Sequence, residues 1–231
     1  MIDIHSHIIY GVDDGGKTIE DSLSLLKEEV QQGVTDVICT PHYRRGMFEE
    51  RSSVIDEHFN EVVECVKKNN LPINLYLGRE IYFNHNVMDM IKNGHLKSLN
   101  NSGIYLLEFS YTEDTEIDEV VYEMTRRGYK VVIAHIERYQ YIKDIEYLYS
   151  LKELGAYIQI NASTICGANG HKEKKKVFNY LKEGLVDFVA SDIHKSRINY
   201  MKESKKIVTK KFGEDMAEKI YTTNAKKIFL N

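Results

Sequence analysis

The sequence predicts an α/β domain in which strand–helix units surround a parallel sheet. Apolar, β-branched runs alternate with amphipathic helical stretches along the whole chain, and this alternation produces right-handed βαβ units. Seven strand candidates in 231 residues give about 33 residues per unit, close to the roughly 31 per unit of a ~250-residue eight-unit barrel. A seven-unit barrel fits this spacing, and an open doubly wound sheet is the alternative.

Each predicted strand is a short run rich in Ile, Val, Leu, Tyr or Phe that ends at polar residues. These runs are residues 2–5, 35–40, 73–80, 104–109, 130–135, 157–161 and 187–192.

Helical periodicity fills the intervals between the strands. The first helix has Thr18 as its N-cap and Gly33 as its stop, the residue types that favour helix ends. The predicted helices are residues 19–32, 49–69, 86–92, 116–127, 144–154 and 172–182, with two or three more ending near 225–230.

Composition indicates one cytoplasmic domain over residues 1–231. The net charge of −4 argues against a nucleic-acid partner, and no apolar run approaches the roughly 18 residues that insert into a membrane. The N-terminus lacks the pattern of a secretory signal. Cys39, Cys65 and Cys166 are odd in number and widely spaced, which favours free thiols in a reducing compartment. The oligomeric state is not predicted.

Ligand-type side chains gather at the predicted strand ends. His5 and His7 are two apart on a strand, so both imidazoles point to one side, and imidazole is a common transition-metal ligand. Six of the seven strand ends, all but the one at Asn161, carry such residues: His5, His7, Asp14, His42, Glu80, Glu108, His135, Asp192 and His194.

These nine side chains converge if the strands are parallel, because the C-terminal ends then share one face. Five imidazoles and four carboxylates are too many for one ion and suit two or three. The mixture of nitrogen and oxygen donors without thiolates favours Mn²⁺, Fe²⁺ or Zn²⁺.

The motifs that contain these residues resemble the PHP (polymerase and histidinol phosphatase) superfamily. More narrowly, the chain is similar to the manganese-dependent capsule-biosynthesis tyrosine phosphatases of the CpsB type. The matching segments span nearly the whole chain and are residues 2–7, 11–15, 40–43, 78–80, 108–109, 134–139 and 190–194.

The resemblance implies a distorted (β/α)7 TIM-like barrel that holds three ions, most typically Mn²⁺, with Fe²⁺, Co²⁺ and Zn²⁺ as alternatives. Its implied ligand sets are His5, His7, Glu80 and Asp192; Glu80, Glu108 and His135, with Glu80 bridging; and Asp14, His42 and His194.

The activity implied by the resemblance is hydrolysis of phosphotyrosine on the tail of a bacterial tyrosine autokinase that controls capsular or exopolysaccharide synthesis. Arg138 is the first candidate for phosphate contact and Arg197 the second, while His42 or His194 assists the leaving phenolate. A small-molecule phosphatase, such as a histidinol-phosphate phosphatase, is one alternative. A non-catalytic partner that binds the phosphorylated kinase tail is another.

Two other motifs fit different chemistry by spacing alone. Residues 11–18 match the P-loop pattern, but Asp13 and Asp14 place two carboxylates where that loop holds phosphates with backbone N–H groups. Residues 39–45 match the C-x5-R spacing of cysteine phosphatases, but Pro41 has no N–H to aim at phosphate. Neither motif is expected to be catalytic.

Overall fold

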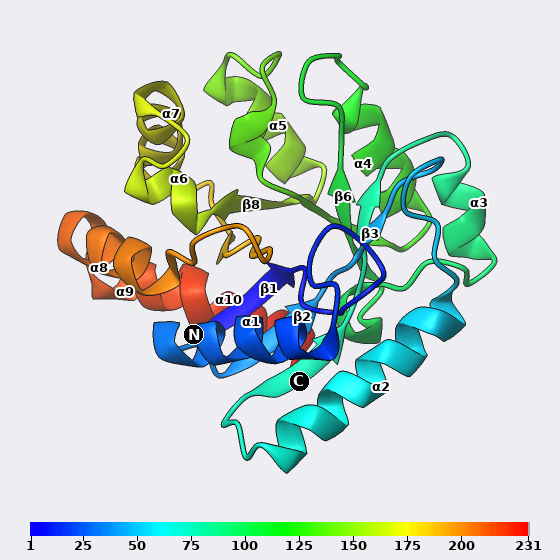
Figure 1. Ribbon diagram of the computed structural model, residues 1–231. Helices are drawn as coiled ribbons and strands as arrows, with labels where there is room; N and C mark the ends of the chain where they lie inside the picture. The colour runs from blue at the N-terminus through cyan, green and yellow to red at the C-terminus, as the bar shows by residue number, and fades with distance from the viewer. Residues whose placement is uncertain (231) are drawn as a thin grey trace.

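The computed structural model describes residues 1–230 as a curled parallel sheet inside a ring of helices (Figure 1). One part of the sheet has the order β1-β2-β4 and the other the order β3-β5-β6-β7-β8-β9, with every pair parallel. The strands are β1 Ile2–Ser6, β2 Asp36–Cys39, β3 His42–Tyr43, β4 Asn74–Leu77, β5 Glu80–Tyr82, β6 Ile104–Glu108, β7 Lys130–Ile133, β8 Tyr157–Asn161 and β9 Phe188–Ala190.

Two strand positions each hold two short strands. The prediction of one strand over 73–80 is wrong, because β4 and β5 divide that range, whereas the predicted strand 35–40 corresponds to β2 and the short β3 beyond it was not predicted. Pro41 has no N–H to donate, and it separates β2 from β3. Gly78 and Arg79 separate β4 from β5. Pairing continues across both breaks, because Gly78 N donates to Cys39 O at 2.9 Å and Glu80 N to Pro41 O at 3.3 Å. The described strands therefore occupy seven positions around the sheet.

The last strand position lies beside the first. Asp192 N donates to His5 O at 3.0 Å and His7 N donates to Ile193 O at 3.0 Å, with a parallel bridge between Ser6 and Ile193. The sheet therefore closes between its first and last strand positions at the C-terminal ends of the strands. An open doubly wound sheet has no such contact. The predicted TIM-like α/β fold is confirmed.

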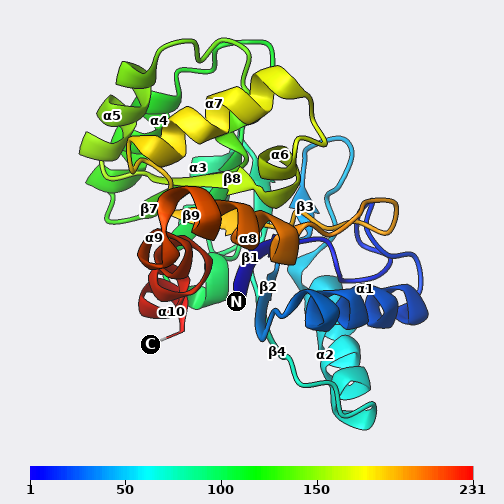
Figure 2. The same cartoon turned by 90° about the vertical axis from the view of Figure 1, so that its left-hand side faces the viewer.

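The helices lie outside the strands in both views (Figures 1 and 2). Thr18 accepts a hydrogen bond from Asp21 N and Gly33 ends α1 at φ 87°, so both predicted caps are confirmed. The helices are α1 Ile19–Gln32, α2 Ser52–Lys68, α3 Val87–Lys92, α4 Ile117–Arg126, α5 Ile145–Glu153, α6 Ala162–Cys166, α7 His171–Lys182, α8 Met201–Phe212, α9 Glu214–Glu218 and α10 Asn224–Phe229. Shorter helical turns are η1 Leu99–Asn101, η2 Ile136–Arg138 and η3 Lys219–Thr223.

The inside of the barrel is apolar where the strands begin and polar where they end. Ile4, Leu106 and Phe188 belong to a buried cluster, and Phe229 of α10 packs on Phe188 with ring centroids 5.5 Å apart. Apolar burial drives this packing and leaves the strand ends free for polar side chains. Within residues 1–230, no helix combines the length and apolarity needed to cross a bilayer.

Candidate metal centre

The nine predicted side chains lie together at the C-terminal ends of the strands. Seven of them line a cavity of about 180 Å³: Asp14, His42, Glu80, Glu108, His135, Asp192 and His194. His5 and His7 are fully buried and lie directly against Glu80. No predicted ligand position falls outside this constellation.

Glu80 is at the centre of the constellation. Its Oε2 atom is 3.1 Å from both His5 Nε2 and His7 Nε2, and Asp192 Oδ1 is 3.8 Å and 3.6 Å from the same two nitrogens. Glu80 Oε1 is 2.8 Å from His135 Nε2. The same His135 nitrogen is 3.8 Å from Glu108 Oε1. The two Glu80 oxygens therefore face two different groups of donors.

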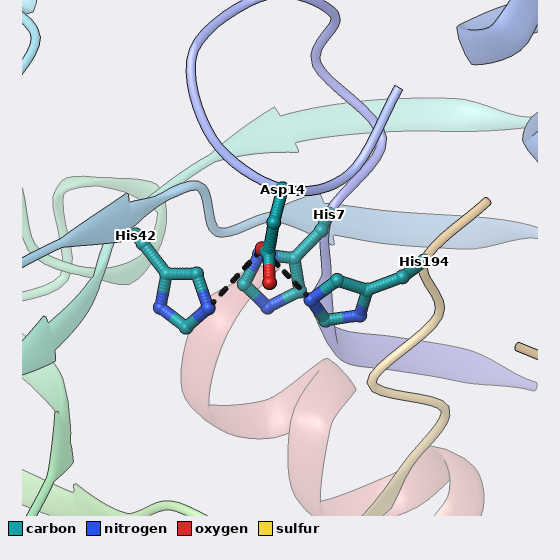
Figure 3. Close-up of side chains that lie close together, drawn as sticks. All are labelled: His7, Asp14, His42 and His194. Atoms are coloured by element: carbon teal, nitrogen blue, oxygen red, sulfur yellow. Dashed lines mark ion pairs between the residues drawn. The ribbon is translucent and has the colours of Figure 1, made fainter. Parts of the chain in front are cut away.

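A third group forms around Asp14 (Figure 3). Asp14 Oδ1 is 3.1 Å from His194 Nε2 and 3.5 Å from His42 Nε2. His7 belongs to this group as well, since its ring stacks on His194 with centroids 4.0 Å apart. The four side chains offer ligand atoms within 4.8 Å of one another.

Hydrogen bonds to one ring nitrogen determine what the other ring nitrogen can do. The Nδ1 atoms of His5, His7 and His194 lie 3.2 Å from Gln159 Oε1, 2.8 Å from Asp13 Oδ2 and 3.0 Å from Asp192 O. These oxygens only accept, so each neutral ring carries its proton on Nδ1 and a lone pair on Nε2. All three Nε2 lone pairs then face carboxylate oxygens, a repulsive arrangement unless a cation lies between them.

Several buried atoms of the centre lack a hydrogen-bond partner. They include Glu80 Oε2, His42 Nδ1 and His194 Nε2. Leaving such groups unsatisfied is costly, and metal coordination satisfies them without a proton. The residues therefore fit divalent metal ions.

The electrostatics of the centre are dominated by burial and by Glu80. Burial alone would raise the pKa of Glu80, but the His5 and His42 imidazoles hold it well below its usual range. Burial and the Glu80 charge raise the pKa of Glu108 to about 7. Burial lowers the pKa of His42 and of His135 to about 4, so these rings are neutral, as metal ligands must be.

The local backbone directs these side chains into the cleft. His135 and Asp192 each follow a strand and adopt φ of 31° and 51°, left-handed values that are uncommon without glycine and concentrate at functional sites. Gly15 lies so close to β1 that a Cβ atom there would be 2.1 Å from His7 O. Only glycine lets the Asp13–Asp14 loop approach His7 this closely.

Two residues of β8, the strand whose end carries no predicted ligand, contribute to the centre although the sequence does not predict it. Asn161 Nδ2 donates to Asp192 Oδ2 at 2.8 Å, and Gln159 Nε2 donates to Asn161 Oδ1 at 2.7 Å. Gln159 Oε1 then accepts from His135 N at 2.8 Å and faces His5 Nδ1. Polar residues alternating on a buried strand were the available signal, since buried amides need partners.

Both candidate arginines contact Asp192. Arg138 Nη2 is 2.8 Å and Arg197 Nη1 is 2.7 Å from Asp192 Oδ2. Arg138 Nη1 also donates to the Tyr111 hydroxyl at 3.3 Å. Both guanidinium groups line the cavity, as does Arg44, so the cleft presents three cations beside the proposed ligands.

The family comparison covers the whole described chain. The family described as "Capsular polysaccharide synthesis, CpsB/CapC" matches residues 1–230. The chain belongs to the CpsB/CapC family. The tyrosine-protein phosphatase CpsB of Streptococcus agalactiae serotype V is 36% identical over 240 residues, covering 100% of this chain and 99% of that protein. The tyrosine-protein phosphatase YwqE of Bacillus subtilis is 31% identical over 235 residues, covering 100% and 92%.

A solved structure supports this membership of the CpsB/CapC family. It comes from the work on YwqE from Bacillus subtilis and CpsB from Streptococcus pneumoniae, described as unique metal-dependent tyrosine phosphatases. It matches with a TM-score of 0.93 at 30% identity, covering 100% of this chain and 95% of that one. A chain of archaeal ribonuclease P is 18% identical with a TM-score of 0.65, covering 99% and 90%, and shows the fold alone.

Proposed function

We propose that this protein is a metal-dependent protein-tyrosine phosphatase of capsular polysaccharide synthesis. The observation that carries the proposal is the arrangement of three Nε2 lone pairs and buried carboxylate oxygens around one cleft. Relatives that span the same length are named tyrosine-protein phosphatases, which agrees with this chemistry.

Three ions, with Mn²⁺ as the first choice, would be held by the three groups around Glu80 and Asp14. The ligand sets in this proposal are His5, His7, Glu80 and Asp192; Glu80, Glu108 and His135; and Asp14, His42 and His194. Four carboxylates leave three dications with a positive balance that suits a phosphate dianion. A dication bound here supplies Lewis acidity and lowers the pKa of a coordinated water.

The chain's own side chains bind and orient the substrate. Arg138 and Arg197 offer planar guanidinium groups for the phosphate oxygens. Met47, Phe48 and Tyr111 line the same cavity and provide apolar surface for a phenyl ring. His42 and His194 face the cavity as well and are our candidates for assisting the departing phenolate, whose pKa of about 10 makes it a modest leaving group.

The substrate in this proposal is phosphotyrosine on the tail of a bacterial tyrosine kinase, and the location is the cytoplasm. The three cysteines are all free thiols, which agrees with a reducing compartment.

The proposal predicts metal-dependent hydrolysis of phosphotyrosine. Exhaustive chelation should abolish turnover of a phosphotyrosine peptide, and added Mn²⁺ should restore it. In this proposal the bound metal ions activate the attacking water, and the ligand side chains alone do not. Steady-state kcat/KM on phosphotyrosine peptide, phosphoserine peptide and histidinol phosphate, with metal content measured in parallel, checks this.

Each outcome has a distinct meaning. Undiminished turnover after confirmed metal loss contradicts the metal mechanism. A preference for histidinol phosphate overturns the substrate and leaves the metal chemistry in place. Tight binding of the phosphopeptide without any turnover, at full metal loading, points to a non-catalytic partner.

A further inference from the structure

Positive charge is concentrated on one flank of the molecule. Residues 171–212 contain 12 Lys and Arg against five Asp and Glu, although the whole chain has a net charge of −4. This segment includes α7 and α8, which lie on the same flank of the molecule with α6 between them (Figures 1 and 2). The rings of Phe178 and Phe212 stack between them with centroids 5.8 Å apart.

A groove of about 730 Å³ lies on this flank, separate from the cleft of the metal centre. Phe178, Tyr180 and Phe212 contribute aromatic surface to it, and Lys211 Nζ is 4.5 Å from the centroid of the Phe178 ring. Six lysines line it, and we call it the lysine groove: Lys143, Lys172, Lys175, Lys176, Lys182 and Lys211.

Most of these lysines have no acidic partner. In the described part of the chain, the one salt bridge of a groove lysine joins Lys182 to Glu183 at 3.9 Å. Lys143, Lys172, Lys175 and Lys211 are exposed, so their charges are available to an incoming anionic group. Several uncompensated cations in one concave surface attract an extended acidic ligand.

The lysine groove adjoins the turn that carries Arg138. Lys176 Nζ donates to Tyr139 O at 2.9 Å and to Glu137 O at 3.3 Å, the carbonyls on either side of Arg138. Lys143 follows the same turn in the chain. A polypeptide whose phosphotyrosine occupies the cleft can therefore continue past this turn into the groove.

We propose that the lysine groove binds an acidic segment of the phosphorylated substrate protein, outside the catalytic cleft. The proposal rests on the proposed phosphatase function and adds a second recognition site to it. A concave groove with aromatic sides suits a polypeptide better than a flat bilayer surface.

The test compares charge-reversal variants in and away from the groove. The groove variant is Lys172→Glu, Lys175→Glu and Lys211→Glu. The control variant is Lys202→Glu, Lys206→Glu and Lys210→Glu, which changes the net charge equally at α8 lysines that do not line the groove. Substrates are a phosphotyrosine peptide with an Asp/Glu-rich flank, the same peptide with that flank neutralised to Asn/Gln, and p-nitrophenyl phosphate.

The groove variant should raise KM for the acidic peptide roughly tenfold, the lower end of electrostatic effects on encounter. Its kcat and its kinetics on p-nitrophenyl phosphate should be unchanged, and the control variant should behave like the wild type. Added salt should remove the wild-type preference for the acidic flank, because exposed charges are screened. If the groove variant melts early, the corresponding Lys→Gln variant replaces it.

Equal KM values for wild type and groove variant overturn the proposal, as does an equal rise of KM in the control variant.

Binding of the non-phosphorylated acidic peptide, measured by fluorescence anisotropy, separates this proposal from the phosphatase function. Peptide binding that is lost in the groove variant supports the groove even if no phosphate ester is hydrolysed. Loss of binding to phosphatidylserine vesicles with peptide binding intact would assign the groove to a membrane instead.

Discussion

At the scale of single residues, neutral amides orient the proposed metal ligands. The Asp192 carboxylate can only accept, so Asn161 must present its NH₂ group to it. That choice directs Asn161 Oδ1 to the NH₂ group of Gln159 and leaves Gln159 Oε1 for His5 Nδ1. The tautomer of His5 is thus determined by the Asp192 carboxylate, which follows β9, through two side chains that are not proposed metal ligands.

Gln159→Ala should lower metal affinity by roughly 10–100-fold, the usual cost of losing a partner that orients a ligand. The reason is that His5 Nδ1 and His135 N both lose their acceptor. Metal titration of the apo protein measures the effect independently of turnover. Ile160→Val, on the same strand with its side chain in the apolar core, is the matched control. Wild-type affinity in Gln159→Ala would remove this residue from the centre.

Cys39→Ser and Lys17→Ala should each keep most phosphatase activity. Cys39 is fully buried and burial raises the pKa of its thiol, so it supplies no thiolate nucleophile. Lys17 is exposed beside the N-cap of α1. The measurement is kcat/KM with metal content and melting temperature. A folded, metal-loaded but inactive Cys39→Ser variant would revive a covalent cysteine mechanism.

The difference between what was and was not predicted follows from how each residue acts. The nine ligand-type residues could be placed because charged or imidazole side chains at parallel strand ends share one face. Gln159 and Asn161 act only through neighbours on β1 and beyond the ends of β7 and β9. No local pattern encodes those contacts, so their role emerged only in three dimensions.

At the scale of elements, the η2 turn and the residues that flank it divide four side chains between four tasks. His135 faces Glu80, while Glu137 Oε1 accepts from Asn161 N at 2.9 Å and from Thr164 Oγ1 at 2.8 Å. Arg138 lines the cleft, and Tyr139 is fully buried. Glu137 anchors the turn to β8 and α6, so the turn holds the His135 and Arg138 side chains in a constant relation.

Arg138→Ala should lower phosphotyrosine turnover by roughly 10²-fold or more, the scale of losing one hydrogen-bond donor to the transition state. Metal content should stay near normal, because Arg197 and Asn161 still hold Asp192 Oδ2. Kinetics and metal stoichiometry of Arg138→Ala and Arg197→Ala, with Arg138→Lys as the conservative variant, check this. Normal kinetics in Arg138→Ala would exclude it from the site.

The broken strand at 73–80 and the unpredicted β3 show where element prediction stops. The apolar run that leads up to Gly78 reads as one strand to residue 80, and the two-residue β3 beyond Pro41 is too short to stand out as a strand. The breaks are defined by backbone pairing, in which β3 pairs with β5 while β2 pairs with β4. Both breaks lie immediately before proposed ligands, His42 and Glu80, and allow each ligand to turn into the cleft.

At the scale of the whole molecule, protons and metal ions compete for the same buried centre. In the metal-free protein, burial disfavours the imidazolium form of His5 and His7, but Glu80 and Asp13 outweigh it and raise both pKa values. Burial and the Glu80 charge raise the pKa of Glu108 to about 7. Each raised pKa means that the folded state holds a proton that the unfolded chain has already released.

The metal-free protein should therefore lose stability as pH rises above about 6.5, the unfolded pKa of histidine, and through the raised folded pKa values of His5 and His7. A group with a raised pKa stabilises the fold below its unfolded pKa and loses that contribution through its folded one. The lowered pKa values of Glu80 and Asp192 affect stability only at acid pH.

The metal-loaded protein should not lose stability in this way, because cations replace the protons and bind deprotonated ligands more tightly. Melting temperatures with chelator and with Mn²⁺ across this range should diverge, and His7→Gln should flatten the chelated curve. Parallel curves would mean that the buried centre does not exchange protons for metal.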